Sequence, residues 1–301
     1  MKRDRPAQTA SMPGIPQRST AALVTLFLCP GLLIYTVFMV WPVAQAAMFS
    51  FFDWNGFGWP TDFTGLRNFV SVLKDPLFWK AFGNNLYLIV FMMATVVPVA
   101  LGLSVVIARR IPFAITFRLI FFLPYVLADL TAGLIWRYLL DGDYGMLSEI
   151  SLFGLNEAYV LANPQLALTA VAVVMVWKSF GFHLILFVAG LQQIDHSLYE
   201  AAEIDGAGPF QKLRRITIPL LAPTIALSGF FVVISSIQAF DMIMAMTTGG
   251  PSRSTSTMVH YLYADGIASM RIGFGSAIGV VIFFITLAFS TTYRKLSGRY
   301  A

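Results

Sequence analysis

Three ionisable side chains, Asp129, Lys178 and Asp241, lie within long apolar stretches of this 301-residue chain. An ionised side chain in hydrocarbon costs about 2.5–3.5 kcal/mol on insertion scales, so each of the three is a candidate for function. One interpretation places them around a polar pathway. The other has them paired with one another or with a partner helix, or lying near water at the end of a span. The residues predicted to line such a pathway are Asp241, Gln238, Lys178, Asp129, Trp177 and Phe240.

Other reactive residue types give no sign of covalent or metal chemistry. The histidines His183, His196 and His260 share no H-x-x-x-H spacing, and Cys29 is the single cysteine, which argues against a catalytic metal and a disulfide. His183 is predicted to make a hydrogen bond within the packing. The sequence contains no G-x-x-x-x-G-K-[ST] loop, so we expect this chain to bind neither ATP nor another cofactor itself. The acids are scattered, which disfavours an integral membrane enzyme.

The composition indicates a membrane protein. Apolar residues make up 57% of the chain and charged residues 12%, with a mean hydropathy of +0.74. A soluble protein carries roughly 25% charged residues. The formal net charge of +5 comes from small basic groups between apolar runs rather than from a basic stripe, so it does not indicate nucleic-acid binding.

Six stretches are long and apolar enough to cross a bilayer as helices, which requires roughly 20 residues each. They predict an all-α polytopic membrane protein with one transmembrane domain, 21–293. The first stretch is broken by Pro30 and Pro42 and is too long for a cleaved signal peptide. Gly275 and Gly279 in the last stretch would let another helix approach closely. The predicted spans are 21–52, 85–108, 117–140, 165–191, 220–246 and 272–293.

The basic residues orient these spans. Thirteen lysines and arginines lie on one side, in 2–18, 109–118, 212–215 and 294–299, against six on the other. Because cytoplasmic loops are enriched in Lys and Arg, both tails, 1–20 and 294–301, are expected in the cytoplasm. Two outer segments, 65–82 and 141–164, mix apolar and charged residues, and we expect the first to lie along the membrane interface.

The loop between the fourth and fifth spans, 192–219, has a defined local pattern. Ser197 is predicted to cap a short helix. Ala201 and Ala202 leave a thin surface that another protein can approach closely. Gly206 permits the bend that ends the helix, and Gly208-Pro209 delays its resumption.

This loop resembles the cytoplasmic EAA signature of ABC importer permeases. Leu213 stands where phenylalanine is commoner in that family, a departure that keeps an apolar side chain. In the family the loop forms a coupling helix that docks on the ATP-hydrolysing subunit. The matching residues are Glu200, Ala201, Ala202, Asp205, Gly206, Ala207, Ile216 and Pro219.

Several further segments resemble the binding-protein-dependent sugar importers, the maltose-type branch of the family. They are 63–69, 75–79, 122–125 with Trp136, 177–181, 189–192, 240–241 and 247–251. The resemblance implies a type I ABC importer permease fold in the bacterial inner membrane. It also implies a non-catalytic subunit that passes a mono-, di- or oligosaccharide or related polyol from an extracytoplasmic solute-binding protein into the cytoplasm. The implied partners are a second, similar permease and two ATP-binding subunits, which hold ATP and Mg²⁺.

Two alternatives stay open at this level. An ATP-independent secondary transporter or channel would not need the loop at 192–219, and often contains inverted repeats or paired broken helices, which the sequence does not show. Within the family, an amino-acid or peptide permease fits the flanking segments less well. The sequence does not name the solute.

Overall fold

The computed structural model describes residues 17–108, 114–145 and 159–297, and helices form nearly all of its regular structure. The prediction of an all-α protein is therefore confirmed, with one two-stranded hairpin as the exception in the described part. The chain divides into two compact units, Met1–Met48 and Phe49–Ala301. Of the predicted tails, only 17–20 and 294–297 are described, and both stretches are helical.

The first unit is a single helical run that ends just beyond its boundary. It comprises α1 (Gln17–Tyr35), the π-helical turn η1 (Thr36–Val40) and α2 (Trp41–Phe49), and Leu26–Phe49 is long and apolar enough to cross a membrane. The expectation that Pro30 and Pro42 break this span was wrong. Pro42 has no N–H to donate, and the preceding turn widens so that the Trp41 N–H bonds to the Thr36 carbonyl, which lets the helix continue.

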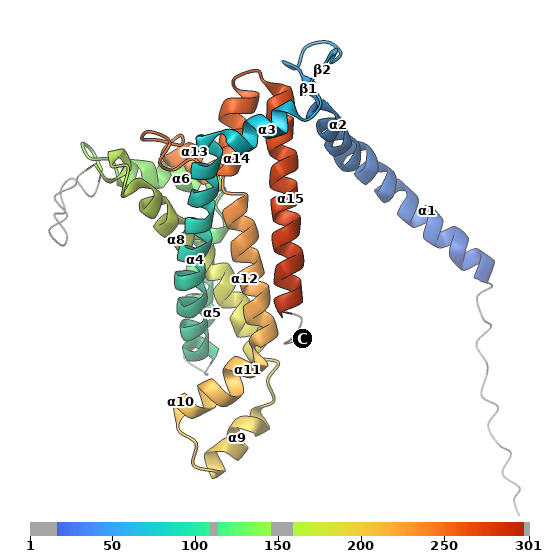
Figure 1. The fold of residues 1–301 in the computed structure, drawn as a ribbon. Coiled ribbons are helices and arrows are strands. Elements are labelled where there is room, and N and C mark those ends of the chain that lie inside the picture. Colours follow the sequence, from blue (N-terminus) through green and yellow to red (C-terminus); the bar gives the residue numbers. More distant parts are fainter. Residues whose placement is uncertain (1–16, 109–113, 146–158, 298–301) are drawn as a thin grey trace, which may run out of the picture. The chain divides into compact units, whose positions relative to one another are not determined.

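The second unit is built around four long helices that lie side by side: α4 (Pro76–Ala108), α8 (Ala167–Leu191), α12 (Ala222–Ile237) and α15 (Ile272–Ser297) (Figure 1). Helix α4 packs against α8 and α12, and α15 packs against α12. One buried cluster joins α4, α8 and α12 through Leu88, Val171 and Val232. A second cluster joins α4, α12 and α15 through Phe78 and Ile278.

The third predicted span, 117–140, is not one helix. Helix α5 (Ala114–Val126) and helix α6 (Asp129–Leu139) meet at 95°. Leu127 and Ala128 separate them, and Ala128 has extended backbone angles (φ −60°, ψ 141°). The expectation of one continuous helix was wrong, because an apolar run gives the length of a span without showing a bend inside it.

The fifth predicted span, 220–246, is also interrupted. Helix α12 ends at Ile237, and a separate helix α13 (Asp241–Met246) follows a three-residue break. At its other end α12 is joined at 68° to the segment Pro209–Leu220, which contains α10 (Pro209–Lys212), the π-helical turn η4 (Leu213–Thr217) and α11 (Ile218–Leu220). Four single helices and two bent pairs thus supply up to six spans in the described part of the chain.

Short elements cover one end of the second unit. They include β1 (Phe52–Asp53), which pairs antiparallel with β2 (Asp62–Phe63), and α3 (Arg67–Lys74), α14 (Met258–Tyr261), the π-helical η5 (Leu262–Ile267) and the 3₁₀ turn η3 (Val160–Ala162). The segment 65–82 contains α3 and the first residues of α4, which begins at Pro76, and its place at the membrane interface stays a prediction. Of the segment 141–164, residues 146–158 lie outside the described residues.

Gly275 allows the close approach expected of it. A Cβ atom on Gly266 of η5 would lie 2.5 Å from the Gly275 Cα, so only glycines fit at this contact.

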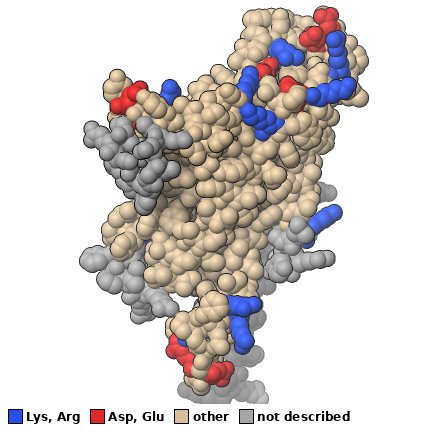
Figure 2. Space-filling view, turned by 60° about the vertical axis from the view of Figure 1, so that its left-hand side comes forward, with Lys and Arg blue, Asp and Glu red and all other residues tan. Residues whose placement is uncertain are grey.

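The charged side chains gather near the two ends of the molecule on the face that Figure 2 shows, and the surface between them carries almost none. Large apolar side chains are exposed on the helices, as with Leu123 of α5 and Phe284 of α15. Such a surface suits a hydrocarbon environment, which needs no polar cover.

Candidate functional site

The loop at 192–219 contains a helical hairpin at the end of the second unit opposite α3 and α14 (Figure 1). Its first arm is α9 (His196–Ile204) and its second is α10. The prediction of Ser197 as the N-cap of α9 was wrong, because the N-cap is Asp195, two residues earlier. The Asp195 carboxylate accepts a hydrogen bond from the Ser197 N–H at 3.0 Å, and this bond lowers the pKa of Asp195.

Helix α9 ends in a Schellman motif. The Ala207 N–H bonds to the Ala202 carbonyl at 2.8 Å, and the Gly206 N–H bonds to the Glu203 carbonyl at 3.0 Å. Gly206 has a φ of +73°, a conformation that side chains with a Cβ disfavour, so the predicted helix stop at this glycine is confirmed. The segment Asp205-Gly206-Ala207 thus turns the chain sharply at the tip of the hairpin.

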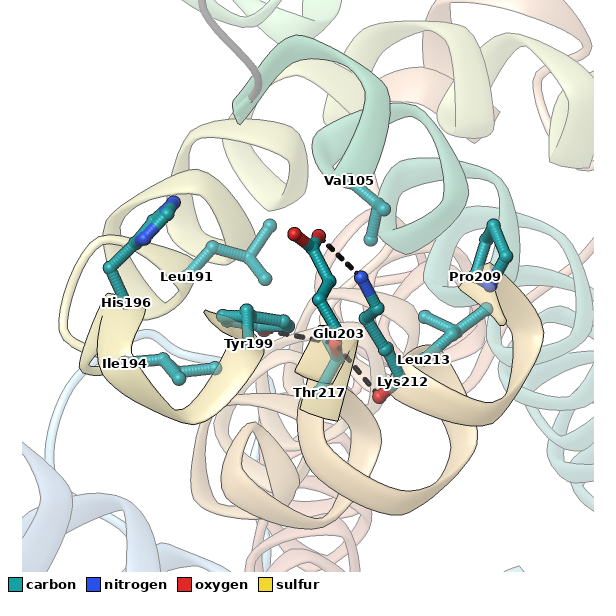
Figure 3. A pocket seen from close by; sticks show the side chains of 10 residues that line it. All are labelled: Val105, Leu191, Ile194, His196, Tyr199, Glu203, Pro209, Lys212, Leu213 and Thr217. Carbon is teal, nitrogen blue, oxygen red and sulfur yellow. Dashed lines mark hydrogen bonds and ion pairs between the residues drawn. The ribbon is translucent and has the colours of Figure 1, made fainter. Parts of the chain in front are cut away.

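An ion pair closes the hairpin. The Lys212 ammonium of α10 lies 2.5 Å from the Glu203 carboxylate of α9, and this hydrogen bond lowers the pKa of Glu203 (Figure 3). The Tyr199 hydroxyl lies 2.9 Å from Thr217 Oγ1 and ties α9 to the turn η4. These side chains line a pocket of ≈ 480 Å³ between the hairpin and the ends of the long helices.

The predicted coupling residues do not share one place. Glu200, Ala201, Asp205 and Gly206 are exposed on α9 and its end, while Ala202 and Ala207 are half-buried. Pro219 lies apart from them in α11, after the turn η4. The turn η4 has the same hydrogen-bond arrangement as η1, the widened turn before Pro42. Pro219 lacks an N–H, and the N–H of the preceding Ile218 bonds to the Leu213 carbonyl.

Two apolar residues of the hairpin were missed by the sequence analysis. Ile204 is 88% exposed and Phe210 is 71% exposed, and they flank the turn at Gly206. The sequence did contain a signal for these two residues, because large apolar side chains in a short polar loop indicate a surface that another protein covers.

The second candidate region is a cavity of ≈ 500 Å³ among the long helices. It is lined from α4, α5, α6, α8, α12 and α13 and from the break between the last two. Five of the six predicted pathway residues, Asp129, Lys178, Gln238, Phe240 and Asp241, line it. The sixth, Trp177, is not among the lining residues, and its ring meets that of Trp136 edge-on with centroids 5.3 Å apart.

Lys178 of α8 sits at the bend between α5 and α6. Its ammonium lies 2.6 Å from the Asp129 carboxylate, 3.5 Å from the Tyr125 carbonyl oxygen and 5.3 Å from the centroid of the Tyr125 ring. Tyr125 is near the end of α5, and Asp129 is the first residue of α6. Lys178 therefore holds the two halves of the bent pair together, and the interpretation that the buried charges pair with one another is confirmed for Asp129 and Lys178.

The break that carries Gln238 and Phe240 is held from the side of α4. The buried Asn85 side chain donates to the Ser236 carbonyl at 2.7 Å and accepts from the Met258 N–H at 2.8 Å. Thr257 donates to the Ala239 carbonyl at 2.6 Å. His183, whose Nδ1 lies 2.8 Å from the Ser228 hydroxyl, is buried by α12 and has the packing role predicted for it.

Comparison with known proteins identifies the family of this chain. Residues 67–300 match the family described as "Binding-protein-dependent transport system inner membrane component". The chain belongs to this family. It is thus a multi-pass inner-membrane permease subunit of a binding-protein-dependent ABC importer, a non-catalytic subunit whose ATPase is a partner. This membership decides against the ATP-independent transporter or channel.

Individual relatives cover nearly the whole chain. The permease protein SmoG of the sulfoquinovosyl glycerol transport system from Agrobacterium fabrum is 32% identical, with 91% of this chain and 90% of that protein covered. The permease protein NgcF of the diacetylchitobiose uptake system from Streptomyces coelicolor is 33% identical, with 95% and 86% covered. A crystal structure of a bacterial ABC transporter involved in the import of the acidic polysaccharide alginate contains a similar chain, with a TM-score of 0.82 at 22% identity over 94% of this chain and 97% of that one. That likeness confirms the importer permease fold.

Proposed function

We propose that this permease translocates a sugar or a related polyol, delivered by an extracytoplasmic binding protein, into the cytoplasm. The support comes from relatives whose names specify carbohydrates, among them diacetylchitobiose and sulfoquinovosyl glycerol. The cavity of ≈ 500 Å³ is of the size that small-molecule sites have, and carboxylate, amide and hydroxyl groups line it beside aromatic rings.

The proposed assembly contains a second, similar permease and two ATP-binding subunits. One ATP-binding subunit docks on the hairpin of α9 and α10. The observation that carries this proposal is the exposure of Ile204 and Phe210 on either side of the turn at Gly206, because these side chains need a covering surface. Closure of the ATPase dimer would draw the two permeases' hairpins together and open the pathway outward, and both chain termini would lie in the cytoplasm.

Purification of the tagged chain from native membranes in mild detergent, followed by mass spectrometry, tests the assembly. We expect an ATPase subunit and a permease to co-purify, together with a binding protein. Recovery of this chain alone, even after chemical crosslinking, would overturn the proposal.

Ile204→Ser tests the docking surface itself. Because Ile204 is 88% exposed, its replacement should cost little in folding, while loss of a central apolar contact should weaken ATPase recovery at least tenfold. Tyr144→Ser is a matched control, since Tyr144 is 93% exposed but lies in the loop that follows α6. Equal ATPase recovery with both variants would mean that the hairpin does not dock there.

A further inference from the structure

The first arm of the hairpin, α9, has few connections through which a movement could reach the rest of the fold. It packs only sparsely against any other described element. The pocket of ≈ 480 Å³ lies between it and the ends of α4 and α8. Residues 192–195, which join α9 to α8, are not helical. A movement of α9 therefore reaches the long helices through this short link or through side-chain bonds to the second arm.

The second arm continues towards the central cavity as a nearly unbroken helical path. Helix α10, the turn η4 and α11 follow one another directly, and only Leu221 separates α11 from α12. The path bends by 68° before α12, which ends at Ile237, next to Gln238 in the cavity lining. Hydrogen-bonded helices are stiff, so this path transmits a displacement better than the non-helical link 192–195 does.

Two residues one helical turn apart on α9 bond to this path. The Tyr199 hydroxyl lies 2.9 Å from Oγ1 of the buried Thr217 in η4. The Glu203 carboxylate accepts a hydrogen bond from the Lys212 ammonium of α10 at 2.5 Å (Figure 3). Thr217 Oγ1 in turn donates to the Lys212 carbonyl at 3.4 Å, so the bonds form one connected set. Because positions i and i+4 share a helix face, one face of α9 is fastened to the second arm.

We propose that the bonds of Tyr199 and Glu203 to the second arm carry the movement of the ATPase from α9 to α12, which makes these two residues and their partners positioning residues for transport. The inference rests on the proposed function and names the route of coupling within it. With the bonds in place, both arms move as one body and α12 displaces the break at Gln238. Without them, α9 moves on its link to α8, and ATP is hydrolysed without displacing α12.

These positions can be changed without altering the proposed docking surface. Ile204 and Phe210 are not members of the bonded set, and Tyr199 is half-buried. Tyr199→Phe combined with Glu203→Gln removes the hydroxyl and the charge while keeping the size of both side chains. A loss of coupling in this double variant therefore differs from a loss of ATPase binding.

The double variant is purified with its ATPase subunits and reconstituted into liposomes. ATP hydrolysis is measured with and without the binding protein, which is isolated from the host with the solute that it carries. ATPase recovery and basal hydrolysis should equal those of the wild type. Stimulation by the binding protein should fall by about fivefold or more, the lower end of typical coupling between two sites, because the signal from the outer side reaches the ATPase along the same path.

Exchange of the charges tests the Glu203–Lys212 bond by rescue. Glu203→Lys alone places two ammonium groups side by side and should lose the stimulation. Glu203→Lys combined with Lys212→Glu restores an ion pair of reversed polarity and should recover most of it. Tyr35→Phe is the matched control for the lost hydroxyl, at a tyrosine of α1 that is 53% exposed, and should behave as the wild type.

Wild-type stimulation in the double variant would overturn the proposal. A parallel loss of basal hydrolysis and ATPase recovery would also overturn it, because the two residues would then act in docking. Failure of the proposed function would show separately, in the wild-type complex itself, as the absence of an ATPase subunit or of any response to the binding protein.

Discussion

Replacement of Lys178 by methionine should destabilise the bend between α5 and α6. Methionine has a similar length and apolar stem but cannot neutralise Asp129 or donate to the Tyr125 carbonyl. The variant therefore leaves a carboxylate without its partner at the first residue of α6.

The structure sets the size of the effect. At 2.6 Å and an effective dielectric constant of about 20, the Coulomb attraction between Lys178 and Asp129 is about 6 kcal/mol before desolvation is subtracted. The Lys178 side chain is 13% exposed, whereas that of Asp129 is 52% exposed, so water screens the pair and rehydrates the orphaned acid. A net coupling of about 1–2 kcal/mol remains, well below the 3–5 kcal/mol of a fully buried pair.

Thermal unfolding of the purified complex in detergent measures this coupling through a double-mutant cycle. At about 2–4 °C per kcal/mol for a domain of this size, Lys178→Met should lower the Tm by about 2–8 °C. Adding Asp129→Asn should lower it little further, because the partner is already lost. Asp241→Asn is the matched control, an acid of the same cavity without an ion pair, and its effect should simply add to that of Lys178→Met. Simple additivity for Asp129→Asn as well would refute the view that Lys178 holds the bend.

Three other outcomes follow from the described contacts. Gly206→Asp should insert normally but lose ATP-driven uptake, because a charged side chain then stands at the tip of the hairpin that we propose docks on the ATPase; wild-type uptake at normal expression would contradict this. Asparagine tolerates the φ of +73° at this position, so Gly206→Asn should lose less of the ATP-driven uptake than Gly206→Asp. The lowered pKa of Glu203 means that its bond to Lys212 stabilises the hairpin above the ordinary Glu pKa of 4.5 and that this stabilisation fades as the pH falls through the lowered value. The Tm difference between wild type and Glu203→Gln should therefore be present at pH 7 and shrink below pH 4.5, and a constant difference would argue against the ion pair. Asn85→Leu leaves the Met258 N–H and the Ser236 carbonyl without hydrogen-bond partners in the core. This loss should lower the free energy of unfolding by about 2–4 kcal/mol, which a clear drop in Tm would report.

The hairpin of α9 and α10 could be predicted from the sequence in most respects. Its helix, its stop at Gly206 and its exposure all follow from local residue types, because a Schellman motif needs a glycine at one position and little else from the rest of the fold. The cap was misassigned to Ser197 because Asp and Ser are both strong caps, and only backbone geometry shows that the Asp195 carboxylate makes the bond.

The two helix breaks could not be predicted in this way, because each depends on contacts from distant parts of the chain. The bend after α5 relies on Lys178 from α8, which lies 49 residues beyond Asp129 in the sequence. The break after α12 relies on Asn85 of α4, which makes its hydrogen bond to Ser236 across 151 residues. The length of an apolar run gives no information about either of these contacts.

A sequence signal for both breaks was nevertheless present in the two acids within apolar stretches, Asp129 and Asp241. Asp129 is the first residue of α6, and Asp241 is the first residue of α13, so each acid stands where a helix restarts inside an apolar stretch. A carboxylate at that position is favoured by the unpaired N–H groups and partial positive charge of the new helix end. An uninterrupted helix would offer neither, and would leave the acid in hydrocarbon at full cost. Both acids also line the same cavity, so in this permease each helix restart places a carboxylate at the cavity wall.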